Sequence, residues 1–266
     1  MRNWIARIVA RNSERLAAMS RVPVLGPCVR ALGRLMLPSR GLVWLQIEGG
    51  AGKNLWMELN LRTGQGYVRG IGEPGVQNFF VQHLKPGMVV YDLGANCGYF
   101  SLIAARCVGA QGRVFSFEPK PALAARVRNN MQRNGFQHCT VVEAAVWRET
   151  GTVSFASSDK SDSPDQGTGQ VTSSAEAGKT KNVRAIALDD FVKNAIAPDF
   201  IKCDVEGAEV DAFRRAVQIL MADKPAIVCE IHSAENGRVL RQELARFGYS
   251  IRNLDENHIC AEPASK

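Results

Sequence analysis

Apolar and polar positions alternate in two short runs near the start of the chain body, residues 42–47 and 55–61. Strict alternation places one face of each run on a core, as in a half-buried strand. The glycine-rich residues 49–52 between the two runs can form the connecting turn. The pattern therefore predicts a β-hairpin over residues 41–69.

After a short predicted helix, residues 76–84, apolar runs of strand length alternate with segments of helical periodicity from residue 88 onward. The predicted strands are residues 88–93, 113–117, 140–146, 200–204, 226–231, 249–254 and 258–262. The predicted helices are residues 76–84, 99–108, 121–134, 208–221 and 238–247. Such alternation is typical of an α/β fold, here a doubly wound, mostly parallel, Rossmann-like seven-stranded sheet. The last two strands are expected to close it as an antiparallel hairpin.

One segment, residues 156–182, does not follow this pattern. It is polar, rich in Ser, Gly, Asp and Thr, and shows no periodicity. A structureless segment of this length inside a domain is often either functional or an insertion. Two interpretations stay open, a loop that covers the site and an inert polar insertion.

Composition narrows the class of protein. The chain has 266 residues, 45% of them hydrophobic and 22% charged, and contains no uninterrupted apolar run of 18 residues. These values exclude a disordered chain and a membrane-spanning protein. We predict two parts, an extension over residues 1–40 and one domain over residues 41–266. The seven cysteines include no C-x-x-C pair, so neither a zinc site nor a disulfide framework is predicted, and we expect a reducing, cytoplasmic compartment.

The net charge of +7 is carried entirely by residues 1–40, which contain eight arginines and one glutamate. Apolar positions in this segment fall on one side of a helical wheel and arginines on another. A basic amphipathic helix fits an anionic membrane surface, which here would be the inner membrane surface. A helix that docks on the body with its arginines in water is the alternative. The neutral body disfavours a nucleic-acid partner.

The strongest chemical signal is the strand-to-helix turn that contains Asp92, Gly94, Ala95, Asn96 and Gly98. Two glycines in such a turn would let a ligand approach the backbone closely. The spacing is not the G-x-G-x-x-G of dinucleotide-binding proteins, and a carboxylate at the strand tip would repel a pyrophosphate. A ligand with an ammonium and a sulfonium group would be attracted instead. S-adenosyl-L-methionine is such a ligand.

The next predicted strand also ends in an acid, in the sequence Phe117-Glu118-Pro119. An acid at this position accepts hydrogen bonds from ribose hydroxyls in related folds. We therefore assign Glu118 and Pro119 to the cofactor site.

Together with Phe200-Ile201-Lys202-x-Asp204-Val205-Glu206-Gly207-x-Glu209, these motifs resemble the signature of the FkbM-type class I S-adenosylmethionine-dependent methyltransferases. The resemblance covers roughly residues 42–255 and includes Gly72-Glu73-Pro74, from which Glu73 is assigned to the cofactor site. It implies methyl transfer to a hydroxyl of a sugar, glycolipid or secondary metabolite. In related folds the turn after the third strand contacts adenine, which makes Glu143 and Ala144 candidates. Close packing by small residues is the alternative there.

The acceptor is expected at the carboxyl ends of the fourth and fifth strands, where open α/β sheets bind ligands. Asp204 and Glu230 end apolar strands, a costly place for a charge without a partner. His232 follows two residues later, so its side chain should point the same way as that of Glu230 if the strand continues. We assign these three residues to catalysis and Asp204 also to the cofactor site. Glu206 and Glu209 could instead cap the following helix.

An aliphatic hydroxyl needs a base to remove its proton, and an ordinary histidine titrates near neutrality. His232 is therefore predicted to be the base, with Asp204 or Glu230 orienting it or binding the acceptor. Acids at these strand tips also hold magnesium in catechol-type methyltransferases. Ile231 offers no ligand atom, so metal-independent chemistry is preferred.

An NAD(P)-linked oxidoreductase and an inactive cofactor-binding module are the remaining alternatives. The oligomeric state is not predicted.

Overall fold

The computed structural model describes residues 41–60, 64–157, 169–171 and 180–264. The predicted basic helical extension, residues 1–40, lies outside the described residues, and so does most of the polar segment 156–182. Within the described ranges no helix is long and apolar enough to cross a lipid bilayer.

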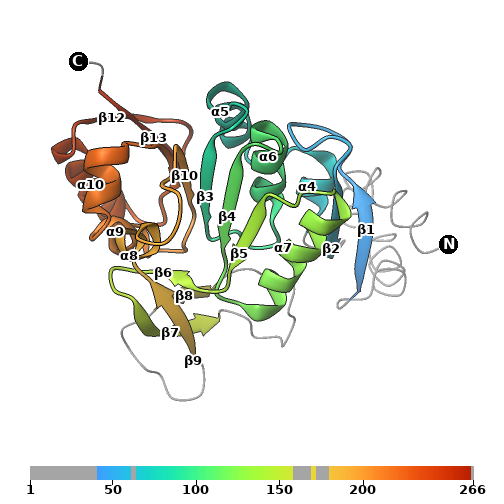
Figure 1. Cartoon of the computed structure of the whole chain (residues 1–266), viewed down its shortest axis with the longest axis horizontal. Coiled ribbons are helices and arrows are strands. Elements are labelled where there is room, and N and C mark those ends of the chain that lie inside the picture. Colours follow the sequence, from blue (N-terminus) through green and yellow to red (C-terminus); the bar gives the residue numbers. More distant parts are fainter. Residues whose placement is uncertain (1–40, 61–63, 158–168, 172–179, 265–266) are drawn as a thin grey trace, which may run out of the picture.

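A seven-stranded sheet forms the centre of the molecule (Figure 1). Its strands, in spatial order, are β12 (Tyr249–Asn253), β13 (His258–Pro263), β11 (Ala226–Glu230), β10 (Phe200–Cys203), β3 (Val89–Leu93), β4 (Arg113–Phe117) and β5 (Cys139–Val142). All neighbours are parallel except β13, which runs antiparallel to both β11 and β12. This confirms the predicted doubly wound sheet and its closing hairpin.

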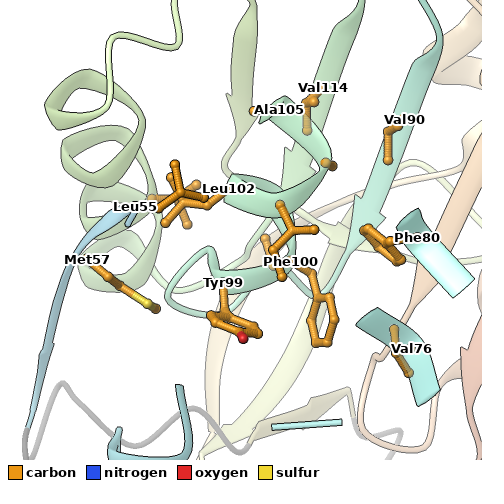
Figure 2. Packing of buried hydrophobic residues seen from close by; sticks show 14 of the residues in the cluster. Leu55, Met57, Val76, Phe80, Val90, Tyr99, Phe100, Leu102, Ala105 and Val114 are labelled. Atoms are coloured by element: carbon orange, nitrogen blue, oxygen red, sulfur yellow. The ribbon is translucent and has the colours of Figure 1, made fainter. Parts of the chain in front are cut away.

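Helices cover both faces of this sheet. They are α4 (Gln65–Arg69), α5 (Pro74–His83), α6 (Tyr99–Val108), α7 (Pro121–Arg133), α8 (Leu188–Val192), α9 (Glu209–Phe213) and α10 (Ala234–Arg246). Successive residues of a strand point to opposite faces. In β3, Val90 packs in a core with α5, α6 and the N-terminal hairpin, whereas Val89 and Tyr91 pack in a second core with α9 and α10. Figure 2 shows part of the first core, in which Phe80 lies between Val90 and Val76, and the ring centroids of Phe80 and Phe100 are 5.3 Å apart.

The predicted N-terminal hairpin is present as β1 (Leu42–Gln46) and β2 (Trp56–Asn60), but the end of the predicted range, residues 65–69, forms helix α4 instead. Two asparagines of the α7 region bind the outer edge of β2. Asn134 accepts a hydrogen bond from the backbone N–H of Trp56 and donates one to its carbonyl, and Asn130 accepts one from the N–H of Glu58. The side-chain amides thus take the place of a third strand and fix the hairpin beside the sheet.

The third predicted strand divides at Glu143 and Ala144 into β5 and β6 (Ala145–Val146), and β6 belongs to another sheet. This second sheet contains β6, β7 (Gly151–Ser157), β8 (Gly169–Val171) and β9 (Thr180–Ile186). The expectation of a segment without secondary structure was therefore wrong for both of its ends, where β7 and β9 extend alternating runs, and for β8 in its interior. Figure 1 shows this small sheet below the main one.

A single helix over residues 208–221 was also predicted, and the structure contradicts it. Helix α9 ends at Phe213, and a π-helical turn, Ile219–Asp223, follows. Asp189 of α8 accepts hydrogen bonds from the backbone N–H groups of Gln218 and Ile219. The Asp189 carboxylate therefore caps the start of a second helical segment, although the hydrophobic pattern of the sequence continues through this point.

Candidate active site

The turn after β3 is built from three residues with positive φ, Gly94 (81°), Asn96 (51°) and Gly98 (88°). A Cβ on Gly94 would lie 1.8 Å from the carbonyl oxygen of Asp204, and a Cβ on Gly98 would lie 3.2 Å from Val127. The two glycines were expected to make room for a ligand. In the structure, the close approach of Asp204 and Val127 leaves no room for a side chain at either position. Gly94 also lines the pocket.

A pocket opens at the carboxyl ends of β3, β4 and β10, the location expected for a ligand in this type of sheet. Six of the predicted cofactor residues line it: Gly94, Asn96, Glu118, Pro119, Ala144 and Asp204. The structure therefore brings these six residues together around one pocket, and their binding of a cofactor stays a prediction.

Glu118 occupies the wall contributed by β4 and is only 5% exposed. Its two carboxylate oxygens accept hydrogen bonds from the backbone N–H groups of Asn96 and Lys120, each at 2.9 Å. Burial raises the pKa of Glu118 to about 7, although these hydrogen bonds lower it. The carboxylate is thus fixed in orientation and retains lone pairs that can accept hydrogen bonds from hydroxyl groups.

Asp92 lies beneath the pocket and does not line it. It is 0% exposed, accepts a hydrogen bond from the Ser101 hydroxyl and lies 3.8 Å from the Lys202 ammonium. Burial raises its pKa, and Lys202 opposes that rise. The expectation that Asp92 faces the ligand is therefore corrected. Its carboxylate instead connects α6 to β10 inside the fold.

Four further predicted cofactor residues, Gly98, Ala95, Glu143 and Glu73, do not line the pocket. Ala95 is buried, and its backbone N–H donates to the carbonyl of Phe117. Glu143 lies on the surface, where it pairs with Arg128 at 3.2 Å, and Glu73 lies 3.3 Å from His258. Glu143 and Glu73 thus each have a charged partner within the protein, Arg128 and His258, which the sequence around them does not indicate.

Sequence reasoning missed two apolar residues of the pocket, Phe155 and Val171. They lie opposite one another in register on β7 and β8 of the second sheet. The alternating residues of Gly151–Ser157 indicate a strand. Which residues of that strand border the pocket depends on how it pairs in the second sheet, and the sequence does not show this pairing. Part of the polar segment therefore borders the pocket.

His232 is surrounded by carboxylates. Its Nδ1 lies 2.5 Å from Glu209, and its Nε2 lies 3.4 Å from Glu206 and 3.8 Å from Asp204. Hydrogen bonding to Glu206 and then to Glu209 raises the pKa of His232 to about 10. At that pKa the imidazole carries a proton at neutral pH, which disfavours the expected histidine base that titrates near neutrality. The catalytic role of His232 stays a prediction.

Asp204 joins the pocket to this cluster, because it lines the pocket and also faces His232. Burial would raise its pKa, but the buried ammonium of Lys202, 3.3 Å away, and His232 outweigh burial and lower it. Asp204 therefore remains ionised. The Lys202 side chain is buried between Asp92 and Asp204, which accounts for this lysine in an otherwise apolar strand.

Glu230 and His232 were expected to point the same way, but β11 ends at Glu230 and the two contact different groups. Glu230 pairs in register with His258 of β13, and its Oε2 lies 3.9 Å from His258 Nε2. Burial, followed by the charge of Asp204, raises the pKa of Glu230 to about 7. His258 is a residue that sequence reasoning did not select.

The strand order, with its antiparallel β13 and its pocket at the switch between β3 and β10, defines the fold of the class I S-adenosylmethionine-dependent methyltransferases. Within this class, residues 92–251 match the methyltransferase FkbM domain, and the chain belongs to that family.

Among curated relatives, the chain is similar to protein-L-isoaspartate O-methyltransferases of two archaea. It is 39% identical over 83 residues to that of Aeropyrum pernix, covering 30% of this chain and 31% of the relative. It is 33% identical over 79 residues to that of Methanococcoides burtonii, covering 29% and 39%. The similarity thus spans about a third of the length of these relatives.

Among solved structures, the chain resembles the methyltransferase FkbM from Methylobacillus flagellatus, with 18% identity and a TM-score of 0.49. That alignment covers 74% of this chain and 53% of the other. An S-adenosylmethionine-dependent O-methyltransferase from Thermotoga maritima aligns over 73% and 66%, with 13% identity and a TM-score of 0.46.

Proposed function

We propose that this protein transfers a methyl group from S-adenosyl-L-methionine to a hydroxyl oxygen of a sugar, glycolipid or secondary-metabolite acceptor. The observation that carries the proposal is the position of Asp204, whose side chain belongs both to the pocket and to the carboxylate–histidine cluster beside it. A carboxylate at this junction lies where a donor in the pocket and an acceptor in the cluster would meet.

The residues of the pocket fit the cofactor chemically. Glu118 would accept hydrogen bonds from the ribose hydroxyls, and Ala144 with Phe155 would form the apolar surface for adenine. The negative charge of Asp204 favours a cationic ligand beside it. S-adenosylmethionine supplies a methyl group on a sulfonium, which is an electrophile without further activation.

Asp204 would accept the hydroxyl proton as the acceptor oxygen forms its bond to the methyl carbon. When bound, S-adenosylmethionine would supply the methyl group and would be left as a neutral thioether once its bond to the methyl carbon has broken. His232, protonated and held by Glu206 and Glu209, would position the acceptor as a hydrogen-bond donor. This assignment makes Asp204 the base and gives His232 a positioning role.

Methylation of a protein carboxylate is a second candidate, favoured by the names of the relatives from Aeropyrum pernix and Methanococcoides burtonii. The acceptor end of the site contains Glu206, Glu209 and Glu230 around His232. Carboxylates so close together would repel a negatively charged acceptor. They would accept hydrogen bonds from a polyhydroxylated one.

Transfer of a labelled methyl group to a panel of acceptors tests the proposal directly. We expect label on neutral glycosides or hydroxylated metabolites and little on an isoaspartyl peptide or on RNA. Calorimetry should detect binding of S-adenosylmethionine and none of NAD. Label on the peptide alone would favour the second candidate, and NAD binding alone would contradict both.

We also propose a cytoplasmic protein that touches an anionic membrane through residues 1–40. Support comes from the arginines of that segment and from the free cysteines of the described residues. The full chain should bind vesicles that contain phosphatidylglycerol, and a variant lacking residues 2–40 should not. Equal binding by both proteins would contradict the membrane contact.

A further inference from the structure

His258 begins β13, is 6% exposed and has a fixed ring orientation. Its Nδ1 lies 2.7 Å from Oδ1 of Asp255, and the same oxygen accepts hydrogen bonds from the backbone N–H groups of Asn257 and His258. A carboxylate held in this way accepts the Nδ1 proton and leaves Nε2 as the ligand atom. The turn between β12 and β13 therefore aims Nε2 toward Glu73 and Glu230.

Nε2 of His258 is buried and makes no hydrogen bond in the described structure, and the same is true of Oε2 of Glu73. The two atoms are 3.3 Å apart, and Oε2 of Glu230 lies 3.9 Å from Nε2. Two ligand atoms that share one tetrahedral ion at about 2.1 Å are about 3.4 Å from each other. The separation of 3.3 Å matches this value, and that of 3.9 Å exceeds it by about 0.5 Å.

We propose that Glu73, Glu230 and His258 bind one divalent metal ion, with Asp255 orienting the histidine. One imidazole and two carboxylates suit Zn²⁺, Mn²⁺ or Fe²⁺ better than Ca²⁺, which prefers oxygen ligands alone. The ligands come from the start of α5, the end of β11 and the start of β13. An ion would thus connect three elements that are distant in the sequence.

Glu73 has a backbone conformation that supports this assignment. It precedes α5 with φ 47° and ψ 62°, a left-handed conformation that is unfavourable for a residue with a side chain. That conformation directs its carboxylate toward His258. A glycine would adopt it at lower cost but would have no carboxylate.

A second group, Asp204, Glu206 and His232, also places three ligand atoms close together. His232 in that group is exposed, whereas His258 is buried. Water can solvate the polar atoms of an exposed cluster, but it cannot reach Nε2 of His258 or Oε2 of Glu73. The buried group is therefore the one in which an ion would bind atoms that make no hydrogen bond and have each other as a charged neighbour.

The catalytic consequence rests on the proposed function, whereas metal binding itself does not. Glu230 interacts with Asp204, so an ion bound to Glu230 would lie beside the acceptor end of the site. There it could bind the acceptor hydroxyl and lower the pKa of that group. This differs from the metal-independent chemistry expected from the sequence.

The test uses the full chain, stripped of metal with a chelator and then titrated with Mn²⁺ or Zn²⁺. Electron paramagnetic resonance and calorimetry should report one ion per chain. Glu73→Gln and His258→Gln should each weaken binding at least tenfold, and Asp255→Asn about tenfold. The control is His83→Gln, because His83 also faces a carboxylate, Glu262 at 3.0 Å, but lies outside the cluster.

Absence of stoichiometric binding by the wild-type chain would overturn the proposal, and so would binding that is lost in His232→Gln but kept in His258→Gln. Thermal melting identifies variants that fail to fold, and Glu230→Gln is a second isosteric variant for that case. Calorimetry with S-adenosylmethionine on the same samples tests the proposed function separately from the metal site. Cofactor binding without metal binding overturns the metal site alone, whereas metal binding without cofactor binding overturns the proposed function alone.

Discussion

The backbone N–H of Asn96 donates a hydrogen bond to Oε2 of Glu118 at 2.9 Å and thereby joins the turn after β3 to the tip of β4. Asn96 makes this bond from a left-handed conformation, φ 51°. The two walls of the pocket are therefore held together by a carboxylate that is also available to a ligand.

The ionisation of Glu118 should control cofactor affinity. Its pKa is raised to about 7 by burial, and ribose hydroxyls donate hydrogen bonds more strongly to a carboxylate than to a carboxylic acid. The affinity for S-adenosylmethionine should therefore fall as the pH decreases below about 7, by up to tenfold per pH unit. Calorimetry between pH 5.5 and 8.5 measures this. Glu118→Gln should bind weakly with a flat profile, and an unchanged slope in that variant would contradict the assignment.

Gly94 should tolerate no side chain. Alanine there would have φ 81° and a Cβ 1.8 Å from the Asp204 carbonyl, so Gly94→Ala should lower the free energy of unfolding by about 3 kcal/mol or more. Gly135→Ala is the matched control, since Gly135 has φ 75° but no atom near its Cβ position. It should cost about 1 kcal/mol. Equal losses in denaturant unfolding would show that the close approach has no energetic role.

His232 should act through its positive charge. With a pKa of about 10 it remains protonated below that pH, so the pH profile of turnover should show no inflection near 6.5 that depends on His232. His232→Ala should reduce turnover about tenfold or more with cofactor affinity unchanged. His232→Lys, which keeps a cation, should retain more activity than the alanine variant. An inflection near 6.5 that disappears in His232→Ala would restore the histidine base.

Phe155 should contribute to cofactor affinity although it lies beside the polar segment. Removing a buried aromatic ring from the pocket wall costs about 1.5 kcal/mol or more of apolar contact. Phe155→Ala should therefore raise the Kd for S-adenosylmethionine about tenfold. Val153→Ala, on the same strand but outside the pocket wall, is the control. Equal affinities of the two variants would contradict a role for the second sheet.

The main sheet could be predicted from the sequence because apolar runs such as 89–93 and 226–230 are bounded by clear turns. Local patterns define such elements whatever their neighbours are. The helix over residues 208–221 was predicted incorrectly because the group that interrupts it, Asp189, is distant in the sequence. The second sheet was missed for a similar reason, since its pairing joins β6 to β9 across the polar segment.

The same limit applies to the site. Glu118 and Asp204 both line the pocket because strand tips in this fold converge at one edge, and their roles toward a cofactor stay predictions. The charge of His232 could not be predicted, since it depends on Glu206 and Glu209 from another element. The side chain of Asp92 is directed inward by Lys202 and Ser101, whose positions only the folded chain defines.

The asparagine contacts on β2 have a consequence for self-association. Exposed strand edges can recruit strands from other molecules, and proteins commonly block them with charges or covering elements. Here the amides of Asn130 and Asn134 already occupy the hydrogen-bonding groups of Trp56 and the N–H of Glu58. These three groups are thereby unavailable for intermolecular β-pairing, and this protection depends on two neutral side chains from the region of α7.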